Sequence, residues 1–203
     1  METPMETWMR LFKLAAQTAA VLGLFQAAQV LAADALPRRA PEYIFTLNGK
    51  ETLLSRERAG KVVAVEFLLT TCSHCQKASE FMTQMYKEFG ARGFLPIGIA
   101  TNDPMMGQTK PVMVASFVKE FKVGFPVGFG PNETARGFMQ IPDNKPMSAP
   151  QMVLIDRAGM IRWEHVGFDE KADPAAIRAK IAELLGGAKP ATKAAPKAAA
   201  PAH

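Results

Sequence analysis

The sequence predicts a three-layer α/β/α sandwich built around a mixed central sheet. Two continuous apolar runs, at 62–69 and 94–100, are typical of strands buried on both faces of a sheet. Amphipathic stretches with apolar residues three and four apart separate the strands and predict helices. A hairpin near the end of the chain adds antiparallel strands to the sheet. The length of 203 residues, with 48% hydrophobic and 21% charged side chains, is typical of one globular domain with residues to spare.

The first part of the predicted domain contains two strands and a long helix. Tyr43–Leu47 is predicted as a short strand, because Asn48-Gly49 turns the chain directly after it. The apolar strand at 62–69 leads into a helix at 72–89. One face of this helix is apolar and consists of Phe81, Met82, Met85, Tyr86 and Phe89.

The middle part of the domain is predicted to continue the alternation. Gly90 ends the long helix, and the second buried strand follows at 94–100. A helix is predicted at 112–121, because its apolar residues lie on one side. A short strand at 125–129 and a short helix at 132–139 complete this part.

The last part of the domain is predicted to be a hairpin and a helix. Strands at 151–156 and 160–166 are joined by the turn Arg157-Ala158-Gly159. The final helix runs over 173–185. Asp173-Pro174 starts it, with an acid at the cap and proline at the first helical position.

Both ends of the chain differ in composition from the domain. Residues 1–35 have the layout of a signal peptide or an N-terminal membrane anchor, since basic residues precede an Ala/Leu/Val run of about the ~20 residues that a membrane helix needs. Residues 36–41 are predicted as a linker, 42–187 as the folded domain, and 188–203 as a disordered tail of Ala, Pro and Lys. We therefore expect an exported protein, periplasmic or extracytoplasmic, and either free or attached to a membrane.

The charge distribution argues against a nucleic-acid partner. The net charge is +5, but Lys189, Lys193 and Lys197 of the tail contribute three of these charges. The rest of the chain is only mildly basic, and it has no basic stripe with interleaved aromatic residues.

The only two cysteines, Cys72 and Cys75, are three residues apart, between a predicted buried strand and a helix. A single pair at this place predicts a dithiol/disulfide redox site. Residues i and i+3 on the first helical turn are close enough for their sulfurs to bond. The unpaired N–H groups and positive dipole end of the helix favour the thiolate, which is the form that attacks a disulfide. A static disulfide or two buried thiols are the structural alternatives.

Two segments resemble the active-site segments of thioredoxin-fold proteins. Val65–Cys75 is similar to the strand and turn that carry the cysteine pair, and Ser148–Ile161 is similar to the cis-proline strand and its hairpin. The helix and strand at 112–129 look like the insertion after the second strand in thioredoxin-like proteins of the TlpA/ResA type, which are related to the AhpC/TSA redoxins. The resemblance covers residues 43–185. It implies a thioredoxin fold, thiol–disulfide oxidoreductase activity and no bound cofactor.

The resemblance assigns catalytic roles to three residues. Cys72 is expected to be the exposed nucleophile, and Cys75 the residue that resolves the mixed disulfide. Glu66 stands six residues before Cys72 in an otherwise apolar strand, where a carboxylate is costly unless it is paired or protonated. At this position the family carries an acid that relays a proton to or from the second cysteine, with a pKa raised by burial. The alternative is that Glu66 points to solvent at a sheet edge.

Five further residues are expected to tune the redox pair or to bind substrate. Ser73 and His74 lie between the cysteines, where the sequence tunes the reduction potential, and an imidazole near Cys72 would stabilise its thiolate. Pro150 is the candidate cis-proline, and the backbone of Ala149 would pair with an extended client segment. Thr71 stands where the family usually carries tryptophan.

The partners implied are protein thiol or disulfide clients and an upstream dithiol electron donor. Ala78 stands where TlpA/ResA-type proteins often carry a helix acid, so the identity of the partner is open. Two other functions remain open at this point. One is a thiol peroxidase, and the other is a copper chaperone that uses both cysteines and soft methionine ligands from Met105, Met106, Met113, Met139, Met147 and Met152.

Overall fold

The computed structural model describes residues 36–103 and 107–186, so the predicted signal or anchor and the C-terminal tail lie outside the described residues. The strands are β1 (Arg38–Arg39), β2 (Ile44–Leu47), β3 (Lys50–Leu53), β4 (Val62–Leu68), β5 (Phe94–Ala100), β6 (Val127–Phe129), β7 (Gln151–Ile155) and β8 (Met160–Val166). The helices are α2 (Leu54–Glu57), α3 (Ser73–Phe89), the 3-10 helix η1 (Gly90–Arg92), α4 (Pro111–Glu120), α5 (Asn132–Phe138) and α6 (Asp173–Leu184).

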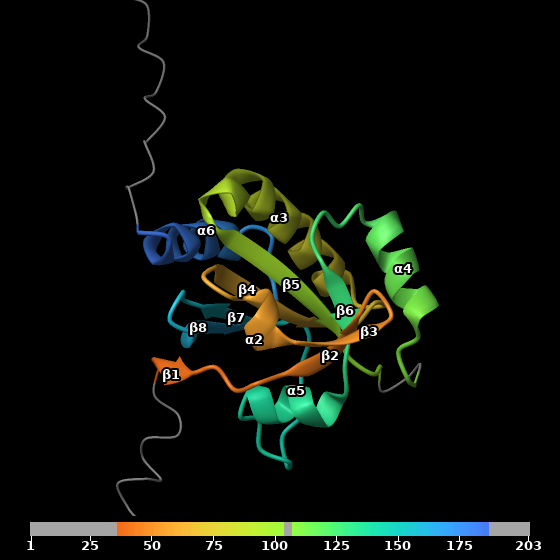
Figure 1. The fold of residues 1–203 in the computed structure, drawn as a ribbon. Helices are drawn as coiled ribbons and strands as arrows, with labels where there is room; N and C mark the ends of the chain where they lie inside the picture. The colour runs from red at the N-terminus through yellow and green to blue at the C-terminus, as the bar shows by residue number, and fades with distance from the viewer. Residues whose placement is uncertain (1–35, 104–106, 187–203) are drawn as a thin grey trace, which may run out of the picture. The chain divides into compact units, whose positions relative to one another are not determined.

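Within the described residues the strands form one mixed sheet, in the order β1-β8-β7-β4-β5-β6-β2-β3. Strands β4, β5 and β6 are parallel, whereas β7 and β8 on one side and β2 and β3 on the other are added antiparallel. Helices α3 and α6 cover one face, and α5 lies on the other (Figure 1). This confirms the predicted α/β/α sandwich, including the helix and strand inserted after β5.

Strand β4 is buried along its whole length and separates two hydrophobic cores. Ala64 and Leu68 pack with α3 and α6, while Val63 and Phe67 pack on the opposite face with Tyr43 and α5. Because successive side chains of a strand point to opposite faces, a continuous apolar run can serve both cores. Full burial of a valine, leucine or phenylalanine side chain stabilises the fold by about 1.5–3 kcal/mol.

Proline is tolerated inside the central strand β5 because of where β6 begins. Pro96 pairs with Ala64 of β4 on one side of the strand. On the other side, pairing with β6 starts only at Gly98, whose N–H donates to Pro126 O at 2.9 Å. The N–H that Pro96 lacks would point to this same side, before β6 begins, so no ladder bond is lost.

The structure differs from the sequence prediction at the start of the domain. Arg38–Arg39, predicted as part of the 36–41 linker, forms β1 and pairs with β8. Arg38 is held there by Glu164, at 2.5 Å, and by Phe138 O, at 2.9 Å. Strand β3 and the four-residue helix α2 were also not predicted.

A smaller difference concerns the last helix. Asp173 is the first residue of α6, and Ala172 is its N-cap, so the predicted acid cap is displaced by one residue. The Asp173 carboxylate still accepts a hydrogen bond from the backbone N–H of Asp169 at 2.7 Å. It therefore satisfies a free donor in the turn that precedes the helix.

Among the helices of the described residues, none has the length and apolar character needed to cross a bilayer.

Candidate active site

The two cysteines lie at the N-terminal end of α3, at the carboxyl edge of β4. Cys72 is the N-cap residue, and its sulfur accepts a hydrogen bond from the backbone N–H of Cys75 at 3.4 Å. Both residues are free thiols. Cys72 is half-buried, whereas Cys75 is 0% exposed. A client can therefore reach the first sulfur but not the second.

Burial raises the pKa of the Cys75 thiol strongly. Its contact with the Cys72 sulfur and the nearby charge of Glu66 act in the same direction. Cys75 is consequently a protonated thiol at neutral pH. It needs a base before it can act as a nucleophile.

Glu66 is that candidate base, and it is 1% exposed in the middle of β4. The hydroxyl of Ser79, from α3, donates to its two carboxylate oxygens at 3.2 and 3.1 Å. Burial raises the pKa of Glu66 to about 8, although the Ser79 hydrogen bond lowers it. The alternative of a solvent-exposed Glu66 at a sheet edge is therefore wrong.

The peptide bond between Ala149 and Pro150 is cis, as predicted. It lies directly before β7, and β7 pairs with β4. This pairing brings Ala149 to the cysteine pair, where its carbonyl oxygen accepts from the Cys72 thiol at 3.7 Å. The two segments that the resemblance singled out thus meet at one site.

His74 and Ser73 are exposed on the first turn of α3. The Nδ1 atom of His74 lies 3.0 Å from Phe168 O, in the loop before α6. Because a carbonyl oxygen only accepts, Nδ1 carries the hydrogen in this contact. The imidazole is thus bonded to the loop, and its effect on Cys72 stays a prediction. A cavity of about 400 Å³ lies beside both side chains, lined also by Lys77 and by 168–171.

Thr71 is exposed, and its hydroxyl donates to the carboxylate of Asp103, which lies beyond the end of β5. Sequence reasoning missed Asp103, Phe168 and Ser79 as neighbours of the site. Only Ser79 carried a usable signal, because it lies four residues after Cys75 and so shares its helix face. The other two are joined to the site by tertiary structure alone.

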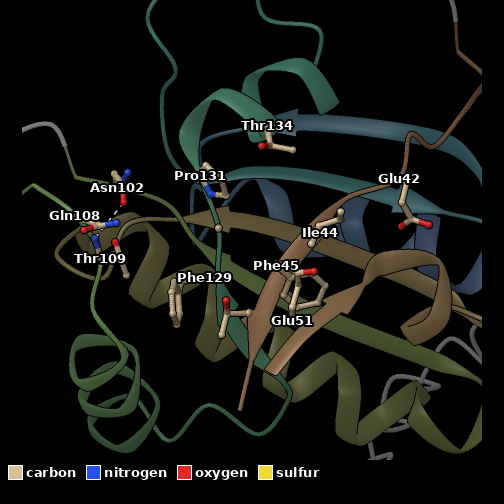
Figure 2. Close-up of a pocket in the computed structure, with 12 residues that line it drawn as sticks. Glu42, Ile44, Phe45, Glu51, Asn102, Gln108, Thr109, Phe129, Pro131 and Thr134 are labelled. Atoms are coloured by element: carbon tan, nitrogen blue, oxygen red, sulfur yellow. Dashed lines mark hydrogen bonds between the residues drawn. The ribbon is translucent and has the colours of Figure 1, made fainter. Parts of the chain in front are cut away.

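A separate cavity of about 450 Å³ lies between β2, β6 and the start of α5 and contains none of the predicted site residues (Figure 2). Phe129 and Pro131 from the end of β6 line it, together with Ile44 and Glu42. On its far side the backbone N–H of Thr109 donates to the Asn102 side chain at 3.1 Å. The polar groups drawn at this corner therefore hold the loop after β5.

Within residues 36–103 and 107–186 no three His, Cys, Asp or Glu side chains gather as a metal site. Of the methionines considered for copper, Met105 and Met106 lie outside the described residues. Met152 is buried in the core beneath α3, and Met139 is buried in the core on the other face of the sheet. These two cannot share one metal ion.

Comparison with known proteins agrees with this geometry. The family model described as "AhpC/TSA family" matches residues 36–164. The thiol-disulfide oxidoreductase ResA of Bacillus thuringiensis subsp. konkukian is 27% identical over 136 residues, which are 66% of this chain and 71% of that protein.

Solved structures give the same result. A putative thiol:disulfide interchange protein DsbE from Chlorobium tepidum is 26% identical, with a TM-score of 0.63 over 74% of this chain and 97% of that one. A thioredoxin family protein from Chlorobium tepidum TLS is 29% identical, with a TM-score of 0.60 over 76% of this chain and 100% of that one. These neighbours confirm the thioredoxin fold and the resemblance to TlpA/ResA-type proteins. Since the family model spans more than half of its length, the chain belongs to the AhpC/TSA family.

Proposed function

We propose that this protein is an exported thiol–disulfide oxidoreductase that exchanges electrons with protein disulfides or dithiols through Cys72 and Cys75. The observation that carries the proposal is the asymmetry of the pair. Cys72 is half-buried at a helix N-terminus, and Cys75 is fully buried near a carboxyl group. The similarity to oxidoreductases of the ResA and DsbE type supports the same reaction class.

The reaction proceeds in two exchanges. The Cys72 thiolate attacks one sulfur of a client disulfide, so a mixed disulfide forms and the other client sulfur leaves as a thiolate. Glu66 then takes the proton of Cys75, and the new thiolate attacks the Cys72 sulfur. The second client thiolate leaves, and the two electrons that reduced the client have come from the Cys72–Cys75 pair, which is now a disulfide. Run in reverse, the same steps oxidise a client dithiol.

Glu66 suits this proton transfer because its pKa of about 8 lies close to neutral pH. A carboxyl with an ordinary pKa would be a much weaker base. The proton that Glu66 accepts during reduction of a client is returned when an upstream dithiol donor reduces the Cys72–Cys75 disulfide. No bound cofactor takes part in these steps.

The client segment is proposed to lie against Thr71, Ala149 and Pro150. The proposal is supported by the hydrogen bond from the Cys72 thiol to Ala149 O, because an extended chain bonded to that sulfur would lie beside the same backbone. Ser73 and His74 are proposed to tune the potential of the pair from the exposed side of α3. Export rests on the composition of residues 1–35, and attachment to a membrane through this segment is compatible with it.

Single cysteine variants test the mechanism with insulin as a model client. Cys72→Ser is expected to abolish insulin reduction, because the accessible nucleophile is lost. Cys75→Ser is expected to accumulate mixed disulfides on Cys72, visible as adducts on non-reducing gels and by mass spectrometry. Substantial activity in Cys72→Ser, or adducts on Cys75, would show that the assigned order of the cysteines is wrong.

A further inference from the structure

We infer that Ser79 is a positioning residue for Glu66. Its hydroxyl holds the carboxyl beneath α3, near Cys75, and favours the charged form that accepts a proton. The inference rests on the proposed function, because it concerns how Glu66 serves as the base for Cys75.

The geometry places Ser79 to act on Glu66. Ser79 follows Cys75 by four residues, so both project from the same face of α3 toward β4. Ser79 is 0% exposed, and its hydroxyl lies 3.2 and 3.1 Å from the two carboxylate oxygens. One hydroxyl hydrogen thus spans both oxygens, which fixes the orientation of the carboxyl group.

The surroundings of Glu66 contain few other groups that could stabilise its charged form, so the hydrogen bond from Ser79 has a large effect on it. Beside it in the sheet lie Gly98 of β5 and Met152 of β7, neither of which carries a charge. From α3 it interacts with Ser79 and Cys75. A carboxylate in such a site has lost its water, so a single donor replaces part of the lost solvation. The Ser79 hydrogen bond accordingly opposes the effect of burial on the pKa of Glu66.

The next turn of α3 supplies a matched control. Thr83 Oγ1 donates to Ser79 O at 2.9 Å and accepts from Gly124 N at 3.1 Å. Thr83 is buried like Ser79 and also carries a hydroxyl, but its hydrogen bonds go to the backbone and not to Glu66. Thr83→Val therefore removes a buried hydroxyl from the same helix without touching the carboxyl group.

The test is a single-turnover reaction of the reduced protein with Ellman's reagent across a range of pH. The first thionitrobenzoate is released when Cys72 attacks, and the second when Cys75 resolves the adduct. In Ser79→Ala we expect the midpoint of the second phase to rise by about one pH unit, since a hydrogen bond to a charged group has that worth. The second phase then slows roughly tenfold at pH 7 and matches the wild type at high pH, while the first phase is unchanged. Ser79→Thr, which restores a hydroxyl, should recover the wild-type profile, and Thr83→Val should keep it.

The Glu66→Gln variant distinguishes a failure of the proposed proton transfer by Glu66 from a failure of the proposed role of Ser79. If Ser79 acts through Glu66, then Ser79→Ala produces no further shift in the Glu66→Gln background. If Glu66→Gln itself leaves the second phase and its pH dependence unchanged, the proposed proton transfer fails. If Glu66→Gln removes the pH dependence but Ser79→Ala behaves like the wild type, the inference about Ser79 alone is overturned. Infrared titration of the carboxyl band, absent in Glu66→Gln, gives the midpoint without turnover, so a loss of activity from misfolding cannot be mistaken for the expected shift.

Discussion

Glu66 and Cys75 are both buried, and burial raises the pKa of each. Burial pushes the pKa of Cys75 far upward, whereas Ser79 moderates the same effect on Glu66. Placing a carboxyl in a strand core opposes stability, because its charged form loses hydration without gaining a cationic partner. A buried carboxyl that opposes stability is expected at a position where the residue serves a chemical reaction and not the packing of the core.

Glu66 should make stability depend on pH. Its pKa rises from an ordinary value of 4.5 in the unfolded chain to about 8 in the folded one, so the folded state binds the proton more tightly. This contribution is present below about pH 4.5 and is lost as the pH rises toward 8. Glu66→Gln keeps an acceptor for Ser79 but has no charge. We expect the free energy of unfolding of Glu66→Gln to equal that of the wild type near pH 4 and to exceed it by a few kcal/mol at pH 8.

Urea unfolding of the reduced proteins at several pH values measures this difference. Glu51→Gln is a suitable control, because that carboxylate is exposed and lies on β3. A stability difference for Glu66→Gln that does not change between pH 4 and pH 8 would contradict the raised pKa.

The sequence could predict part of the site at the residue scale. Glu66 was identifiable because a charge in an apolar strand needs an explanation, and Pro150 because its strand and hairpin resemble a known segment. The partner of His74 could not be predicted, since Phe168 O is a backbone group 94 residues away whose position depends on the packed loop before α6. The same holds for Asp103 and Thr71, which are 32 residues apart.

At the scale of elements, strand β6 is joined to β2 through an unusually close approach of backbones. A Cβ atom built at Gly128 would lie 2.3 Å from Thr46 O and 2.7 Å from the ring of Phe45. Backbone and a buried aromatic ring cannot both move aside, so glycine is required where β2 joins the sheet next to β6.

Gly128→Ala should therefore destabilise the protein by about 1–3 kcal/mol, the usual cost of overpacking. Gly137 of α5 provides the control, because nothing lies within 4 Å of a Cβ atom built there. Gly137→Ala should be neutral or stabilising by up to about 1 kcal/mol from helix propensity. Thermal or urea unfolding of the two variants measures the contrast, and equal stabilities would refute the close approach.

The long elements were predictable, whereas β1, β3 and α2 were not, for a physical reason. Strands β4 and β5 and helix α3 each have enough residues to show a period or an apolar run. Strand β1 has two residues, and β3 and α2 have four each. Such segments have no period of their own, and their structure depends on the strands beside which they lie.

At the scale of the whole molecule, the sheet begins earlier than composition suggested. Pro and Arg dominate residues 36–41 and are typical of a linker, but Arg38 is largely buried through its bonds to Glu164 and Phe138 O. Strand β1, its neighbour β8 and the end of α5 are thereby joined by one side chain.

Arg38→Ala should lower the free energy of unfolding by about 1–3 kcal/mol, because a charge-assisted hydrogen bond and a bond to a buried carbonyl are both lost. Arg39 is the matched control. It is the other residue of β1, it carries the same charge, and it is exposed, so Arg39→Ala should change stability by less than about 0.5 kcal/mol. If the two variants unfold at the same urea concentration, then β1 contributes as little as a linker would.

The pairing of β4 with β7 also has a consequence for the newly made chain. Both thiols and Glu66 belong to residues 66–75, whereas the Ala149 carbonyl that borders Cys72 comes 77 residues later. Synthesis proceeds from the N-terminus, so the dithiol leaves the ribosome well before the segment that will enclose it. During that interval Cys72 lacks the Ala149 carbonyl that borders it in the folded protein. The contact between Cys72 and Ala149 is therefore acquired only when β7 joins the sheet beside β4. A chain that stops before Ser148 would carry the cysteine pair without this carbonyl beside it.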